Sequence, residues 1–263
     1  MASVKQSFHF DINNTFCISL DSAPERWSHM CSRFREHNMN VVRWIASTPD
    51  NLTEKFADYM NPGQRACAQS HFYIWRHMVS ENLPYALILE DDAMFDHQWF
   101  SKLSEMIVDV GEWDAIFLNA SEAITPAYQW TLVTDQYLTG GYVLSLEGAK
   151  RLLGMFSGEL WGADWMTTRL QTMGRSWSYF PWLIIQEGFE STIGSGVEAD
   201  HAKVVRLLGD IGYSLEENYV VRLVGDLEEP TTNVSGIQHS MRVINFVEPL
   251  ENEGILKKLT TLL

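Results

Sequence analysis

Short apolar runs alternate with stretches of helical period along the first half of the chain. Residues 15–20 form an apolar run that predicts a strand, and residues 41–46 predict a second one. Between them, apolar side chains recur at i, i+3, i+4 and i+7: Trp27, Met30, Cys31 and Phe34. This spacing places all of them on one face of a helix. The chain therefore opens with a predicted strand–helix–strand unit.

Helix-start signals precede two of the predicted helices. Ser22 and Glu25 have the spacing of a capping box, and Pro24 suits a first helical turn. Residues 61–63, Asn-Pro-Gly, interrupt regular secondary structure before a helix predicted over about residues 65–80. Both signals support the same alternation of strands and helices.

The alternation continues to about residue 195. The predicted strands are 85–89, 113–118, 142–146 and 177–185, and the predicted helices include 147–155 and 161–173. Such alternation predicts an α/β fold with a mostly parallel sheet. The pattern then becomes less regular, so we expect a core over residues 1–196 and an extension over residues 197–263 packed on it.

Composition narrows the class of protein. The 263 residues are 46% hydrophobic, enough for one large domain, and carry a net charge of −15. That charge argues against a nucleic-acid partner, which needs clustered Lys and Arg. No apolar run approaches the ~18 residues of a membrane span and the N-terminus lacks a signal-like apolar core, so we expect a cytoplasmic protein. The amphipathic end, residues 255–263, allows at most peripheral membrane contact.

An acidic triplet, Glu90, Asp91 and Asp92, ends the predicted strand 85–89. Ligands of open α/β sheets bind at the carboxyl ends of strands. Alternation places Glu90 and Asp92 on one face and Asp91 on the other. Converging carboxylates suit Mg²⁺ or Mn²⁺, which would stabilise a diphosphate leaving group. For an isolated triplet, an acidic loop that caps the next helix is the favoured explanation, so the site interpretation needs other support.

That support is a resemblance carried by segments in a fixed order. These segments are, in chain order, CISLD (17–21) with ERW (25–27), QRACAQSHFYIW (64–75), YALILEDDA (85–93), LTGGYVLSLEGAKRLL (138–153), GADW (162–165) and PWLIIQEGFESTIGS (181–195). Together they resemble glycosyltransferase family 25, which includes lipopolysaccharide and collagen galactosyltransferases. The resemblance covers about residues 13–196, with Ala66 and Gly140 departing from the family's pattern.

The resemblance implies a fold and an activity. The fold is GT-A-like: a Rossmann-type mixed sheet flanked by helices. The activity is an inverting, metal-dependent transfer of a sugar, most often galactose, from a UDP-sugar to a hydroxyl of a glycan, lipid-linked or protein acceptor. Mn²⁺ or Mg²⁺ is the implied cofactor.

The resemblance also implies roles for residues. Glu90 and Asp92 are the expected metal ligands, and Asp164 is the expected catalytic base, with Glu187 and Glu190 as alternatives. The expected donor contacts are Leu20, Arg26, Ser70, His71, Asp91, Gly140 and Gly141. His201 and His239 are both candidates for a third metal ligand. Simpler explanations stay open for each: a helix N-terminal acid for Asp164, a surface charge for Arg26, a structural histidine for His71 and a plain turn for the glycines.

Two other functions remain open on the sequence. One is a non-catalytic module of the same fold that binds nucleotide sugars or glycans. The other is a metal-dependent phosphohydrolase, which is less favoured because its nucleophilic Asp would normally come first, where Glu90 stands.

Overall fold

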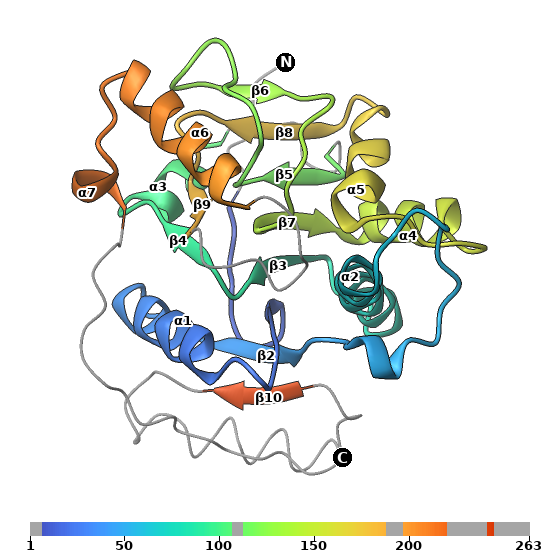
Figure 1. Cartoon of the computed structure of the whole chain (residues 1–263). Helices are drawn as coiled ribbons and strands as arrows, with labels where there is room; N and C mark the ends of the chain where they lie inside the picture. The colour runs from blue at the N-terminus through green and yellow to red at the C-terminus, as the bar shows by residue number, and fades with distance from the viewer. Residues whose placement is uncertain (1–6, 107–112, 188–196, 220–240, 245–263) are drawn as a thin grey trace.

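The protein is built on an eight-stranded mixed sheet (Figure 1). The computed structural model describes residues 7–106, 113–187, 197–219 and 241–244. In spatial order the strands are β10 (Met241–Ile244), β2 (Val41–Ile45), β1 (Thr15–Ser19), β3 (Tyr85–Glu90), β7 (Gly141–Ser145), β5 (Ala115–Phe117), β8 (Ser176–Tyr179) and β6 (Trp130–Leu132). A separate antiparallel ribbon joins β4 (Ala93–Phe95) to β9 (Ile184–Gln186).

The sheet is mixed rather than mostly parallel. Strand β1 pairs in parallel with β2 and β3, and β5 pairs in parallel with β8. Strand β7 lies between β3 and β5 and is antiparallel to both. Between β5 and β7, residues 118–140 contain β6 and no helix. Parallel neighbours are usually joined by a crossover helix, so the antiparallel return of β7 accords with its absence there. The α/β class, with a mixed sheet flanked by helices, is confirmed.

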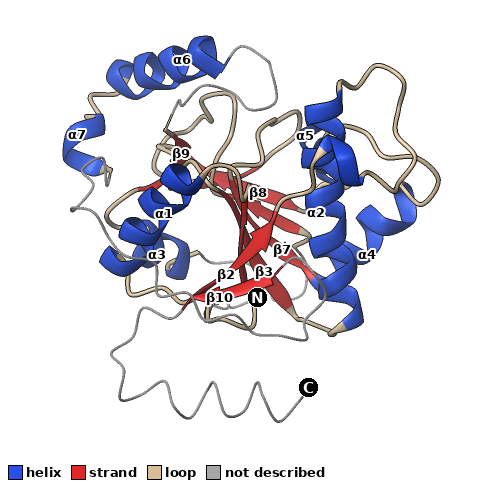
Figure 2. Cartoon of the chain, turned by 60° about the horizontal axis from the view of Figure 1, so that its bottom comes forward, coloured by secondary structure: helices blue, strands red, loops and turns tan. Residues whose placement is uncertain are grey.

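Helices cover both faces of the sheet (Figure 2). Helices α1 (Pro24–Glu36) and α3 (Trp99–Ser104) lie on one face. Helices α2 (Pro62–Ser80), α4 (Leu146–Met155) and α5 (Ala163–Gln171) lie on the other. A short 3₁₀ helix, η1 (Pro49–Asn51), precedes α2. No helix within the described ranges is long and apolar enough to cross a membrane.

The central strand β3 shows how the two faces are filled. Ala86 and Ile88 belong to the hydrophobic cluster on the α2 side, whereas Leu87 and Leu89 belong to the cluster on the α1 side. All four are fully buried, as expected of a strand covered on both faces. Because successive side chains alternate, the residue that ends β3 points to the α2 side and the next one to the α1 side.

Most of the predicted elements are present, with two corrections. The predicted face of α1 is buried, but the Ser22–Glu25 capping box is wrong, because Ala23 is the N-cap and no side chain caps the helix. The predicted strand 177–185 is two strands, β8 and β9, with Pro181 in the segment between them. Proline has no N–H to donate to a sheet, which explains a break there.

Helices α6 (Val197–Asp210) and α7 (Leu215–Asn218) lie against the core. Val204 and Leu208 of α6 join the hydrophobic cluster on the α2 side. After α7, the Tyr219 hydroxyl donates a hydrogen bond of 2.6 Å to the backbone oxygen of Trp182. The division at residues 196 and 197 stays a prediction, since most of the extension lies outside the described residues.

A glycine in α4 tests the packing of helix on sheet. A Cβ at Gly148 would lie 2.4 Å from the backbone oxygen of Asp114, so Gly148→Ala forces the helix away from β5. We expect a loss of about 1–3 kcal/mol in the free energy of unfolding, measured by urea denaturation. Gly154→Ala, in the same helix with nothing within 4 Å, is the matched control and should gain about 0.4–1 kcal/mol. Equal effects of the two substitutions would contradict the close approach.

Candidate active site

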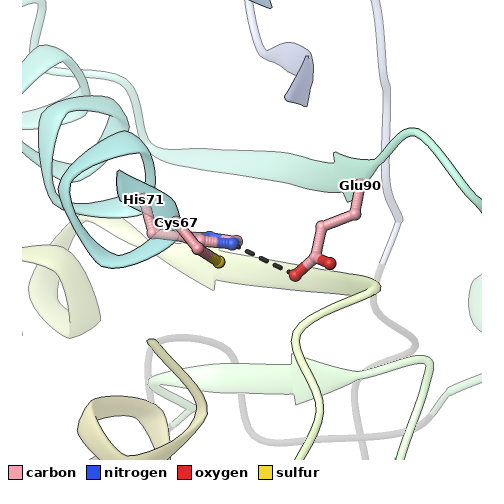
Figure 3. A group of neighbouring side chains, drawn as sticks. All are labelled: Cys67, His71 and Glu90. Atoms are coloured by element: carbon pink, nitrogen blue, oxygen red, sulfur yellow. Dashed lines mark hydrogen bonds and ion pairs between the residues drawn. The ribbon is translucent and has the colours of Figure 1, made fainter. Parts of the chain in front are cut away.

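The three acidic residues stand where β3 leaves the sheet, and the first of them faces α2. Glu90 ends β3, and its Oε1 lies 3.2 Å from Nε2 of His71 (Figure 3). The Thr139 hydroxyl donates to the same oxygen at 2.6 Å. Burial alone would raise the pKa of Glu90, but the hydrogen bonds from His71 and Thr139 and the charge of Arg26 outweigh it, and the pKa is lowered. Glu90 is therefore an ionised carboxylate held toward α2.

A buried hydrogen-bond chain orients His71. The indole N–H of Trp75 donates to the Tyr142 hydroxyl at 3.0 Å, and that hydroxyl lies 2.9 Å from Nδ1 of His71. An indole N–H can only donate, so the Tyr142 hydroxyl accepts from Trp75 while it also hydrogen-bonds Nδ1 of His71. A carboxylate can only accept, so Nε2 of His71 donates to Glu90. His71 and Tyr142 are fully buried, so the chain fixes where Glu90 points.

The next two acids are held from the α1 side. The Arg26 guanidinium, in the first turn of α1, lies 2.6 Å from Oδ1 of Asp91 and 3.4 Å from Oδ2 of Asp92. The Gln186 amide also donates to Oδ2 of Asp92, at 3.3 Å. Glu90 and Asp91 thus follow the alternation predicted for a strand. Asp92 lies beyond the end of β3, where alternation no longer applies, and shares Arg26 with Asp91.

The site has more negative than positive charge. Burial, followed by the charge of Glu90, raises the pKa of Asp92 to about 7, although Arg26 and Gln186 oppose the change. Burial also raises the pKa of Asp91 against the charge of Arg26. Asp91 and Asp92 offer oxygen atoms of the kind that hard divalent cations prefer, whereas Glu90 lies on the α2 side of the turn.

Asp164 approaches the same strand end from α5. It lies in the first turn of α5, and its Oδ1 accepts a hydrogen bond of 2.9 Å from the Trp165 backbone. Burial raises the pKa of Asp164, and the charges of Glu90 and His71 also act on it. The structure therefore brings the predicted base within electrostatic reach of Glu90. Trp165 beside it is 47% exposed and packs against the ring of Tyr59.

Other predicted donor contacts have partners within the protein. Ser70 is buried, donating to the Ala66 carbonyl and accepting from the Ser47 backbone, both at 2.8 Å. A Cβ at Gly140 or Gly141 would lie 2.8 Å or 2.6 Å from side-chain atoms of β9, so close internal packing gives both glycines a structural role. Their roles in donor binding stay predictions.

The remaining candidates lie near the turn or outside the described residues. Leu20 directly follows β1, and its backbone hydrogen-bonds Asp91. Glu187 is ion-paired with the buried Arg33 of α1 at 2.5 Å. Glu190 and His239 fall outside the described residues, as does the side chain of His201.

Sequence reasoning gave no role to four residues that lie around the acidic groups: Cys67, Thr139, Tyr142 and Gln186. All four stand inside the segments that carry the family resemblance. Arg33 was also missed, although it lies seven residues after Arg26 and so on the same face of α1. That spacing was a usable signal.

Parts of the chain match known glycosyltransferases in sequence. Residues 12–131 match the profile of glycosyltransferase family 25, described as LPS biosynthesis protein. The resemblance to that family is confirmed. The mouse protein named procollagen galactosyltransferase 2 is 30% identical over 35% of this chain. The Haemophilus influenzae protein named lipooligosaccharide biosynthesis protein lic2B is 28% identical over 52% of this chain.

The matches are partial. The chain covers 17% of the length of the mouse protein and 61% of that of the Haemophilus protein. A solved structure, described as a glycosyltransferase involved in the glycosylation of the major capsid of PBCV-1, aligns over 73% of this chain and 98% of its own, at 10% identity. Its TM-score of 0.36 is too low to add to the description of the fold.

The pKa of Asp92 predicts how stability depends on pH in the metal-free protein. With a pKa near 7 in the folded state and near 4 when unfolded, the folded state binds the proton more tightly, so stability is lost as pH rises from about 4 to 7. Asp92→Asn removes this loss. At about pH 8, with a metal chelator present, the free energy of unfolding of Asp92→Asn should be about 1–4 kcal/mol higher than that of the wild type.

Urea denaturation between about pH 4 and pH 8 measures this difference, which should shrink toward the acid end. Asp50→Asn, at an exposed carboxylate of η1, is the control and should follow the wild type. A difference between the wild type and Asp92→Asn that stays constant over the range would refute the charge excess.

Proposed function

We propose that this chain transfers a sugar from a UDP-sugar to a hydroxyl group of a glycan, glycolipid or protein, with inversion, using Mn²⁺ or Mg²⁺. The observation that carries the proposal is the charge excess of the three carboxylates at the carboxyl end of β3. Buried carboxylates with one guanidinium between two of them favour a bound cation, and a cation there favours a diphosphate. The family match over residues 12–131 supports the same class of reaction.

The α1 side of the turn suits the donor. Asp92, with Asp91 or Glu90, would hold the cation, which supplies positive charge to the leaving diphosphate. Arg26 already lies against Asp91 and Asp92, so its guanidinium is placed to bind phosphate oxygens once a cation takes over the carboxylates. The backbone of Leu20 lies at the same place, where β1 ends.

The α2 side suits the acceptor. Asp164 is the proposed base that takes the proton of the attacking hydroxyl, because its burial raises its pKa toward the range useful in proton transfer. Trp165 and Tyr59 present exposed rings next to it, and aromatic faces pack well on the C–H surfaces of sugars. Galactose is the proposed donor sugar because the mouse relative is named a galactosyltransferase.

Donor binding is tested by thermal denaturation with a panel of nucleotide sugars, with and without Mn²⁺. We expect one UDP-sugar to raise the melting temperature only with the metal. Asp92→Ala should abolish the shift, whereas Asp50→Ala should keep it. In a transfer assay with the same donor, Asp92→Ala should lower kcat by about 10²–10³-fold, as expected when charge stabilisation is removed.

The other functions predict different results. A metal-dependent shift with no turnover on any glycan, lipid or peptide acceptor would favour a non-catalytic binding module. Release of phosphate from simple esters without an acceptor would favour a phosphohydrolase. No shift with any nucleotide would refute the cation site at Asp92.

A further inference from the structure

Two side chains of α2 converge with Glu90 on one point. Cys67 and His71 lie one helical turn apart and both point toward the end of β3, as Figure 3 shows. The Cys67 sulfur, a ring nitrogen of His71 and a carboxylate oxygen of Glu90 all lie within 4.8 Å of one another. The donor binding proposed above makes no use of the Cys67 sulfur.

The three donor atoms are of the kinds that zinc prefers. Thiolate, imidazole and carboxylate together are typical of Zn²⁺, whereas Mg²⁺ and Mn²⁺ favour oxygen ligands. Zinc bonds of about 2.0–2.3 Å place neighbouring tetrahedral ligands about 3.3–3.7 Å apart. The distance from Nε2 of His71 to Oε1 of Glu90 is already 3.2 Å. We propose that Cys67, His71 and Glu90 form a binding site for Zn²⁺ or a similar thiophilic divalent ion.

Neighbouring groups already orient two of the ligands. The Tyr142 hydroxyl lies 2.9 Å from Nδ1 of His71, so Nε2 is the nitrogen directed to the ion. The Thr139 hydroxyl holds Oε1 of Glu90 at 2.6 Å. Hydrogen bonds of this kind to the ligands are typical of metal sites and fix their geometry before the ion arrives.

The site differs from the acidic turn in position and chemistry. Asp91 and Asp92 contact Arg26 on the α1 side, whereas Cys67 and His71 approach Glu90 from α2. Cys67 and Glu90 are only half-buried, which leaves a fourth position for water. As the ion binds, the Cys67 thiol releases its proton to solvent. The His71 ring exchanges its Nε2 proton for one on Nδ1, which the Tyr142 hydroxyl accepts, and the Glu90–His71 hydrogen bond is replaced by two metal bonds. The ion would then tie α2 to the end of β3.

Cobalt is the probe, because a Co²⁺–thiolate bond gives a charge-transfer absorption band in the near ultraviolet that oxygen ligands do not give. The full metal-free chain is titrated with Co²⁺ and then with Zn²⁺. We expect one Co²⁺ per chain with a thiolate band that Zn²⁺ abolishes. Cys67→Ser should remove the band, and His71→Gln should weaken Co²⁺ binding at least tenfold.

Cys31→Ser is the matched control, since Cys31 is a buried thiol of α1 outside the cluster, and it should keep the band. Asp92→Asn should keep it too. Absence of the band in the wild type, or its persistence in Cys67→Ser, overturns the proposal. If circular dichroism shows that Cys67→Ser does not fold, the wild type loaded with Zn²⁺ is measured by X-ray absorption at the zinc edge. One sulfur ligand supports the site, whereas oxygen and nitrogen ligands alone refute it.

This inference does not rest on the proposed transfer of sugar. Donor binding is read from thermal shifts with Mn²⁺ and depends on Asp92, whereas the cobalt band depends on Cys67. Either result can fail while the other stands.

Discussion

The structure around the end of β3 depends on how the negative charges of three consecutive carboxylates, largely removed from water, are balanced by neighbouring groups. A buried charge is costly unless it is paired and hydrogen-bonded. The sheet meets this requirement by alternation, which sends Glu90 toward α2 and Asp91 toward α1. Each helix then brings its own partner, His71 from α2 and Arg26 from α1. The positions of the two helices on opposite faces are thus coupled through one short acidic turn, and the balance stays incomplete at Asp92, whose pKa rises to about 7.

The ribbon of β4 and β9 closes this turn from a distant part of the chain. Gln186 of β9 donates to Asp92, and the backbone N–H of Glu187 donates to the Asp92 carbonyl at 2.8 Å. Side chains of the same ribbon, Gln186 and Ile184, lie where a Cβ at residues 140 and 141 would stand. The Gly140 carbonyl in turn accepts the Glu90 N–H at 3.1 Å. The acidic turn is therefore held by backbone contacts that do not depend on its charges, which is why it can keep an unbalanced charge for a ligand to neutralise.

Much of this could be predicted from the sequence, because it depends on local pattern. The helical spacing of Trp27, Met30 and Phe34 predicted α1, and the apolar run before Glu90 predicted a central strand. Strand direction could not be predicted in this way: periodicity is the same for parallel and antiparallel strands, so β7 was missed as the antiparallel strand beside β3. Contacts between distant segments were also beyond a single sequence. Nothing local to Thr139 or Gln186 indicates that each reaches an acidic side chain more than forty residues away.

Glu90 is the one residue that both sides of the turn require. With its Oε1 held by His71 and Thr139, it belongs to the α2 side, and its charge reaches the α1 side mainly by raising the pKa of Asp92. An oxygen-seeking cation at Asp91 and Asp92 would use that charge without displacing Glu90. A thiophilic ion at Cys67 and His71 would neutralise Glu90 and so lower the repulsion felt by Asp92. The two sites are therefore linked by electrostatics, and occupancy of the α2 site would weaken the attraction of the α1 site for a second cation.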